Sequence, residues 1–178
     1  MTSAAADRTL VLIRHSKAEQ VPGRADHDRE LTARGHRDAS AIGEWLHEQG
    51  LCADLVLCST AVRTRQTWDG AAHAGTGTDR VEYLRQIYSG RPDAVLAAIH
   101  DEGEDADTVF VVGHNPTIAM LASMLSDGEG SREAHEALAA GVSTSGVAVL
   151  RFRGEWDHLS PESATLERLH TCRAEQVS

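Results

Sequence analysis

The sequence TLVLIRHSKAE, residues 9–19, contains a continuous apolar and β-branched run that changes abruptly to charged residues at Arg14. Such a run is typical of a strand buried on both faces of a parallel sheet. The change of character places Arg14 and His15 at the carboxyl end of that strand. Because ligand sites of open α/β sheets lie beyond this end of the strands, the junction predicts both a fold class and the position of a site.

Further strands and helices are expected to alternate along the chain. Strands are expected at 53–58, 81–84, 108–112 and 146–152, and helices at 31–49, after Ser59-Thr60, from Pro92, from Pro116 and at 132–140. Ser59-Thr60 and Asn115 are expected to cap the helices that follow them. This alternation predicts an α/β fold, in which a mostly parallel central sheet lies between two layers of helices.

Length and charge limit the classes of protein that need to be considered. The 178 residues predict one domain, 1–178, with a core at about 9–152 and a C-terminal tail, 153–178, whose structure the pattern does not indicate. A net charge of −10 argues against nucleic acid or anionic membranes as partners. Three cysteines without metal-site spacing and a start without a signal-peptide pattern predict a cytoplasmic protein with reduced thiols.

Polar residues of complementary types follow three of the expected strands. Arg14-His15 follow the first, Ser59 to Arg63 follow the second, and Gly113-His114-Asn115 follow the strand at 108–112. In a parallel sheet these junctions lie at one edge. Arginine matches the geometry of phosphate oxygens, and histidine is a nucleophile that phosphorus accepts. The set therefore predicts phosphoryl transfer that needs neither a metal nor a cofactor.

Four short motifs carry a family resemblance, and they occur in this order. They are Arg14-His15-Ser16, Leu31-Thr32-Ala33-Arg34-Gly35, the segment 59–67 (STAVRTRQT) and the segment 112–116 (VGHNP). With these motifs the chain resembles the histidine phosphatase superfamily, and within it the compact SixA-like phosphohistidine phosphatase branch. The resemblance implies a phosphoglycerate mutase-like fold and a phosphohistidine intermediate on His15. It also implies that Arg14, Arg63 and His114 bind the phosphoryl group.

Residues beside these four are secondary candidates. Ser16 and Asn115 adjoin the two histidines, and Asp28 and Arg29 belong to a loop that either lines the pocket or is simply solvated. Arg65 is excluded, because two residues beyond Arg63 on a helix it points the opposite way. Thr67 shares the helix face of Arg63.

The sequence offers no clear general acid. Larger relatives in the superfamily place an acidic residue after the second histidine, where this chain has Asn115, or use a glutamate after the third strand. Glu82 is the candidate for that second role, although a solvated charge explains it equally well. Imidazole leaves a protonated phosphohistidine as a neutral molecule, so this substrate needs an acid less than an alkyl phosphate does. The short chain also leaves little length for a cap, so a protein side chain could reach His15.

These observations favour a phosphatase that acts on protein phosphohistidine, and three alternatives stay open. The first is a small-molecule phosphomonoesterase with Glu82 as its general acid. The second is a non-catalytic module that binds phosphate or a phosphoprotein, which would have no need of His15 as a nucleophile. The third and weakest is a metal-dependent hydrolase, because the ten histidines show neither HxH nor HxxxH spacing. The expected partner is thus a phosphorylated protein or a small phosphorylated molecule.

Overall fold

In the computed structural model, which describes residues 6–175, seven strands form one sheet in the order β3-β2-β4-β1-β6-β7-β5. The strands are β1 Asp7–Arg14, β2 Leu55–Ser59, β3 Val81–Leu84, β4 Thr108–Gly113, β5 Ser126–Gly130, β6 Gly146–Arg153 and β7 Ala164–Thr171. Only β6 runs against its neighbours, β1 and β7, and the other paired strands are parallel. The predicted α/β fold with a mostly parallel sheet is confirmed.

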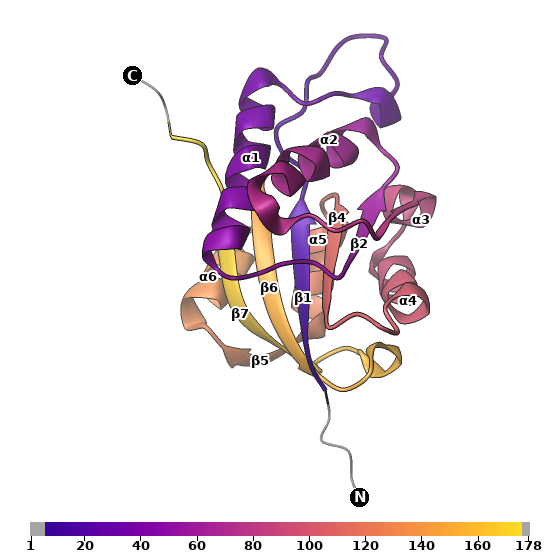
Figure 1. The fold of residues 1–178 in the computed structure, drawn as a ribbon, viewed down its shortest axis with the longest axis vertical. Helices are drawn as coiled ribbons and strands as arrows, with labels where there is room; N and C mark the ends of the chain where they lie inside the picture. Colours follow the sequence, from indigo (N-terminus) through magenta and orange to yellow (C-terminus); the bar gives the residue numbers. More distant parts are fainter. Residues whose placement is uncertain (1–5, 176–178) are drawn as a thin grey trace, which may run out of the picture.

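Helices cover both faces of this sheet, as Figure 1 shows. They are α1 Ala33–Glu48, α2 Val62–Ala71, α3 Arg85–Ser89, α4 Pro92–Glu102, α5 Thr117–Leu125 and α6 Arg132–Ala140. Helices α1 and α2 pack on one face, and α3 to α6 pack on the other. Short turns complete the chain at η1 Asp26–Asp28, η2 Ala72–Thr76 and η3 Trp156–His158. None of the helices in residues 6–175 is both long and apolar enough to cross a membrane.

Strand β1 lies at the centre of the sheet and is buried on both of its faces. Leu10 and Leu12 pack into the cluster beneath α4 and α5, whereas Val11 and Ile13 pack into the cluster beneath α1 and α2. Each such side chain contributes about 1.5–3 kcal/mol when it is fully buried. The backbone of His15 then donates from N to the carbonyl of Gly113 at 3.0 Å. The end of β1 is therefore held firmly beside the end of β4.

The Leu31–Gly35 motif holds the start of α1 against the chain just after His15. Thr32 caps α1, because its Oγ1 accepts from the backbone N–H of Gly35 at 2.9 Å. The backbone N–H of Thr32 donates to the carbonyl of Lys17 at 2.9 Å. A Cβ atom on Gly35 would lie 2.1 Å from that same carbonyl oxygen. Only glycine permits this close approach.

Two of the expected helix caps are wrong. The residues at the N-caps of α2 and α5 are Ala61 and Pro116, and neither provides a side-chain cap. Asn115 instead donates its amide to the carbonyl of Val142 at 2.7 Å, and the Ser59 hydroxyl contacts His114 at 2.7 Å. The two polar side chains are thus directed toward the ends of the strands.

The C-terminal tail forms part of the sheet, which the sequence pattern does not indicate. Strand β7 pairs antiparallel with β6, and β5 pairs with β7 at the edge. In β5 four of five residues are exposed, so no apolar pattern marks it as a strand. The short helix α3 is also absent from the expected elements. Ala164 and Leu166 of β7 and Ile87 of α3 are buried in the core, whereas β5 has no buried residue and is held by its pairing with β7.

Candidate active site

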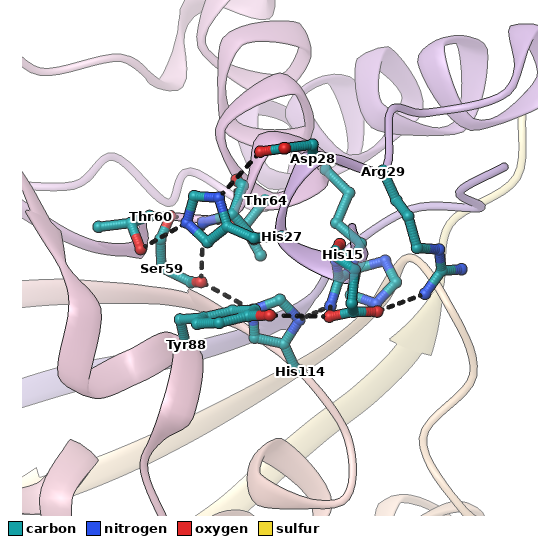
Figure 2. Close-up of polar contacts among 12 residues, drawn as sticks. His15, His27, Asp28, Arg29, Ser59, Thr60, Thr64, Tyr88 and His114 are labelled. Atoms are coloured by element: carbon teal, nitrogen blue, oxygen red, sulfur yellow. Dashed lines mark hydrogen bonds and ion pairs between the residues drawn. The ribbon is translucent and has the colours of Figure 1, made fainter. Parts of the chain in front are cut away.

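The carboxyl ends of β1, β2 and β4 open into a cavity of about 640 Å³. Five of the predicted residues line it: Arg14, His15, Arg63, His114 and Asn115. Residues from loops and short helices also line it, among them Lys17, Asp26, Arg29, Tyr88 and Thr144. In Figure 2, Tyr88 and Arg29 approach from opposite sides, with His15 and His114 between them. The three strand ends therefore converge as the sequence predicts.

His15 is held in a defined orientation and tautomer. Its side chain is buried, and Nδ1 lies 2.7 Å from the backbone carbonyl oxygen of Ser16. Because a carbonyl oxygen only accepts, the proton belongs on Nδ1, and Nε2 carries the free lone pair. The ring centroid lies 5.3 Å from that of His114. This geometry leaves one nitrogen available as a nucleophile.

A hydrogen-bond network behind His15 fixes the carbonyl that orients it. The backbone N–H of Ser16 donates to Oγ1 of Thr67 at 3.0 Å, and the two hydroxyls of Ser16 and Ser145 lie 2.7 Å apart. Ser145 is fully buried and has φ 60°. That left-handed conformation costs a non-glycine residue on the order of 1–3 kcal/mol. Ser16 thus supports His15 from behind and does not line the cavity.

The loop of residues 141–145, between α6 and β6, also holds the predicted residues beside the histidines. The carbonyl of Val142 accepts from Nη1 of Arg14 at 2.8 Å and from the amide of Asn115 at 2.7 Å. The backbone N–H of Ser145 donates to the carbonyl of His15 at 3.2 Å. One short loop therefore contacts three residues at the ends of β1 and β4.

Arg63 projects from α2 into the cavity and is almost completely buried. Its Nη1 donates to the backbone carbonyl of Asp26 at 2.6 Å, and its Nη2 contacts Oδ2 of Asp26 at 3.1 Å. Nη2 also lies 3.2 Å from Nδ1 of His114. Arg63 therefore joins η1, α2 and the end of β4.

His114 accepts one hydrogen bond and donates another. Because the guanidinium of Arg63 only donates, Nδ1 of His114 is the acceptor and the proton belongs on Nε2, 2.7 Å from the Ser59 hydroxyl. The Tyr88 ring lies edge-on to the His114 ring, with centroids 5.7 Å apart. His114 is thus a neutral imidazole that lies between the ends of β2 and β4.

Three buried polar atoms without hydrogen-bond partners belong to residues that line the cavity, which is typical of a ligand-binding site. In the part of the chain that the structure describes, the buried side-chain polar atoms without a hydrogen-bond partner are Nε of Arg14, Nε of Arg63 and Oδ1 of Asn115. All three residues line the cavity. Buried polar groups in folded proteins are normally paired. Two arginine side chains that line one cavity, each with an unpaired N–H group, favour an anionic ligand.

Burial and charge keep both histidines neutral. Burial, together with the charges of Arg63 and Arg14, lowers the pKa of His15 to about 4. Burial and the charge of Arg63 lower the pKa of His114 to about 3. Partial burial alone would raise the pKa of Asp26, but its hydrogen bonds to Arg29 and Arg63 outweigh that effect and hold the pKa at about 2. The site therefore contains two neutral imidazoles and one ionised carboxylate.

The structure does not bring Glu82 into the cavity. Glu82 is exposed on the edge strand β3, in register with Leu57, two positions before that strand ends at Leu84. It is not among the lining residues. Glu82, the candidate general acid in the sequence, therefore lies outside the cavity. The residue that does reach the cavity from this region is Tyr88, in the short helix that follows β3.

The loop after β1 contributes a residue that the sequence analysis missed. The sequence allowed Asp28 and Arg29 either to line the pocket or to be solvated. Arg29 lines the cavity, whereas Asp28 does not. Asp26, which was not singled out, is the lining carboxylate.

Arg65 points away as predicted, since its guanidinium lies 5.0 Å from the centroid of the Tyr83 ring. Within the described residues, no group of three or more histidines, cysteines and acidic residues is arranged to hold a metal ion.

Comparison with known proteins identifies the family. The model of the histidine phosphatase superfamily (branch 1) matches residues 10–93. A protein of Nakamurella multipartitia that is assigned as a phosphohistidine phosphatase, SixA, is 37% identical, with a TM-score of 0.81 over 96% of this chain and 99% of that chain. This chain belongs to the histidine phosphatase superfamily. Its four motifs are those on which the resemblance rests.

Two further relatives of this histidine phosphatase span nearly the whole chain. The structure of a protein assigned as SixA from Agrobacterium tumefaciens is 30% identical, with a TM-score of 0.73 over 92% of this chain and 97% of that chain. The uncharacterized protein Rv1276c of Mycobacterium tuberculosis is 40% identical over 162 residues, which are 90% of this chain and 100% of that protein. The histidine phosphatase fold is therefore shared with two proteins assigned as SixA over 92% and 96% of this chain.

Proposed function

We propose that this histidine phosphatase removes phosphoryl groups from phosphohistidine in a phosphorylated protein. In the proposed reaction Nε2 of His15 attacks phosphorus, the phosphorus–nitrogen bond of the substrate breaks, and the substrate imidazole leaves as a neutral molecule. Water then attacks phosphorus on His15, the bond between phosphorus and Nε2 breaks, and His15 returns to a neutral imidazole. The inorganic phosphate that leaves carries both protons of the water. The hydrogen bond from Nδ1 to the Ser16 carbonyl, 2.7 Å long, supports His15 as the nucleophile because it leaves Nε2 unprotonated.

Arg14, Arg63 and His114 are proposed to bind the phosphoryl group. The unpaired Nε atoms of Arg14 and Arg63 supply donors for oxygens that carry increasing negative charge in the transition state. A phosphoryl dianion beside His114 would raise the pKa of this imidazole, because a nearby negative charge favours its protonated form. His114 could then donate to a phosphoryl oxygen. Asn115 is proposed to orient the loop of residues 141–145 rather than to donate a proton.

The observation that carries the choice of substrate is that no protonated carboxylic acid is found among the described residues that line the cavity. Asp26 is the one carboxylic side chain among the described residues that line the cavity, and its pKa of about 2 keeps it ionised. An alkoxide leaving group needs a proton, whereas the imidazole of a protonated phosphohistidine does not. The similarity to proteins assigned as phosphohistidine phosphatases supports the same conclusion.

The test compares reaction rates with two kinds of substrate. The protein is incubated with a histidine-phosphotransfer domain phosphorylated on histidine, and separately with a panel of alkyl phosphate monoesters, with a chelator present in both. We expect kcat/KM for the phosphohistidine to exceed that for every ester. Faster hydrolysis of an ester would overturn the proposal. Glu82→Gln is the control for the monoesterase alternative, because lower ester turnover in this variant would restore Glu82 as the acid.

The protonation state of the two histidines is open to direct measurement. Since burial lowers the pKa of His15 to about 4 and that of His114 to about 3, both rings are expected to stay neutral at pH 5.5 in the free protein. Unperturbed histidines titrate near pH ~6.5. Ring resonances followed by NMR between pH 4 and 8, with His15→Asn for assignment, provide the check. A midpoint near 6.5 for His15 would contradict the predicted desolvation.

The same shifts determine how stability depends on pH. The unfolded chain takes up these protons near pH ~6.5, whereas the folded chain does not until the pH falls to about 4 and about 3. The free energy of unfolding is therefore expected to decrease as the pH falls from about 6.5 to about 4. Chemical denaturation at several pH values measures the trend, and His15→Asn should weaken it.

A further inference from the structure

The loop between β1 and α1 contains Asp26, whose carboxylate contacts Arg63. Arg63 is one of the residues that are proposed to bind the phosphoryl group. One oxygen of Asp26, Oδ2, lies 3.1 Å from Nη2 of Arg63 and accepts from the Tyr88 hydroxyl at 3.1 Å. The other, Oδ1, accepts from Nη1 of Arg29 at 3.0 Å. The carboxylate is therefore held by three donors inside the cavity.

Asp26 uses the donors that a bound anion would need. Arg63 directs one N–H of Nη1 to the backbone carbonyl of Asp26 and shares Nη2 between the Asp26 carboxylate and His114. Among the described residues, Nε of Arg63 has no partner, and Nη1 keeps a second N–H. A carboxylate and a phosphoryl group present similar pairs of oxygens to a guanidinium. Both anions cannot accept the same N–H of Arg63. Binding of a phosphoryl group to the N–H of Nη2 that Asp26 accepts therefore requires the Asp26 carboxylate to leave that N–H.

The position of Asp26 allows such a displacement. It begins the one-turn helix η1, which contains no buried residue, and its side chain is 55% exposed, compared with 6% for that of Arg63. Segments with few buried contacts open at low free energy. Rotation of the Asp26 side chain alone would therefore leave the core of the sheet undisturbed, and it would keep the hydrogen bond from Nη1 of Arg63 to the backbone carbonyl of Asp26.

We propose that Asp26 is an internal competitor for the phosphoryl site: it pairs with Arg63 in the free protein, is displaced by the substrate, and returns as phosphate leaves. This inference rests on the proposed function, because it assumes that Arg63 binds the phosphoryl group. The consequence is weaker binding of inorganic phosphate, which limits inhibition by the product. An alternative role, in which Asp26 only holds Arg63 in place for the ligand, predicts the opposite effect on phosphate binding when the carboxylate is removed.

Asp26→Asn tests the sign of this effect, and Asp28→Asn is its matched control. Both variants remove one negative charge from the same turn, but among the described residues the one polar partner of the Asp28 side chain is the His27 ring, at 3.4 Å. Binding of inorganic phosphate is measured by titration calorimetry, and product inhibition is measured with a phosphohistidine substrate. We expect Asp26→Asn to bind phosphate about 10-fold more tightly than the wild type and Asp28→Asn to change binding by less than about 2-fold.

The outcomes separate this inference from the proposed function. Weaker phosphate binding by Asp26→Asn would overturn the competition, because Asp26 would then be a positioning residue for Arg63. Equal binding by all three proteins would also overturn the competition and leave the phosphoryl site intact. No binding by any of them would overturn both. Asp26→Ala, which cannot reproduce the hydrogen bonds of an amide, must show the same tightening as Asp26→Asn, and circular dichroism checks that each variant is folded.

Discussion

Replacement of His15 with alanine is expected to lower kcat by about 10⁴-fold or more, because the variant lacks the atom that accepts the phosphoryl group. Nε2 is the one ring nitrogen of His15 without a hydrogen bond, since Nδ1 contacts the Ser16 carbonyl at 2.7 Å. The expected intermediate is a phosphoramidate, which is labile in acid and stable in base. Rapid quenching in base after mixing with phosphorylated substrate should therefore trap phosphate on the wild-type protein and none on His15→Ala.

His158→Ala provides the matched control for this experiment. His158 belongs to η3, which follows the antiparallel strand β6 and so lies at the opposite end of the sheet from the cavity. Its side chain is 76% exposed. The same histidine-to-alanine change there is expected to leave both kcat and the trapped phosphate as in the wild type. A loss in both variants would indicate damage to the fold rather than loss of a nucleophile.

Two results would contradict the assignment of His15. Trapped phosphate on His15→Ala would show that another residue accepts the phosphoryl group. If the wild type traps no phosphate and turns over none of the substrates while it still binds phosphate, the chain would be a phosphate-binding or phosphoprotein-binding module instead. The experiment thus separates a catalytic site from a binding site that keeps the same fold.

The part of the site that is predictable from sequence comes from three local junctions. Arg14-His15, Arg63 and His114 each follow an apolar strand, and the sheet order places β2, β4 and β1 side by side. Parallel strands bring their carboxyl ends to one edge, so residues that are local in sequence become neighbours in space. The same rule points to the segment after β3, where Tyr88 reaches the cavity. Glu82 lies inside that strand and not after it, which is why it does not line the cavity.

The remaining parts of the site depend on contacts between distant segments. Asp26 contacts Arg63 across 37 residues of sequence, and Ser16 contacts Ser145 across 129 residues. No periodicity or cap signal marks such pairs, because polar loop residues take their positions from the elements that they meet. Strand β7 is a similar case, since it is ordered by pairing with β6. Local pattern therefore predicts the residues at the strand ends that line the cavity but not the residues that contact them from distant segments.

Arg63→Ala is expected to lower kcat/KM by about 10²- to 10³-fold, because removal of a preorganised cation leaves the charge of the transferring phosphoryl group uncompensated. Arg63 is buried beside His114, so water replaces it poorly. Arg63→Lys should recover only part of the loss, since an ammonium group lacks the planar fork of donors. Steady-state kinetics with phosphohistidine substrate measure all three proteins.

Arg65→Ala is the matched control, and it tests the helical geometry as well as the chemistry. Arg65 lies on the same helix, two residues further on, and its guanidinium is 5.0 Å from the centroid of the exposed Tyr83 ring, outside the cavity. The change removes the same charge from α2 but is expected to leave kcat/KM nearly unchanged. Equal losses in both variants would mean that the net charge of α2, and not the position of one guanidinium, supports the reaction. If the position of the Arg63 guanidinium matters, Arg63→Ala must also weaken the binding of inorganic phosphate, whereas Asp26→Asn strengthens it. The reason is that Arg63 attracts the oxygens of the bound phosphate, whereas the Asp26 carboxylate competes with them for Arg63.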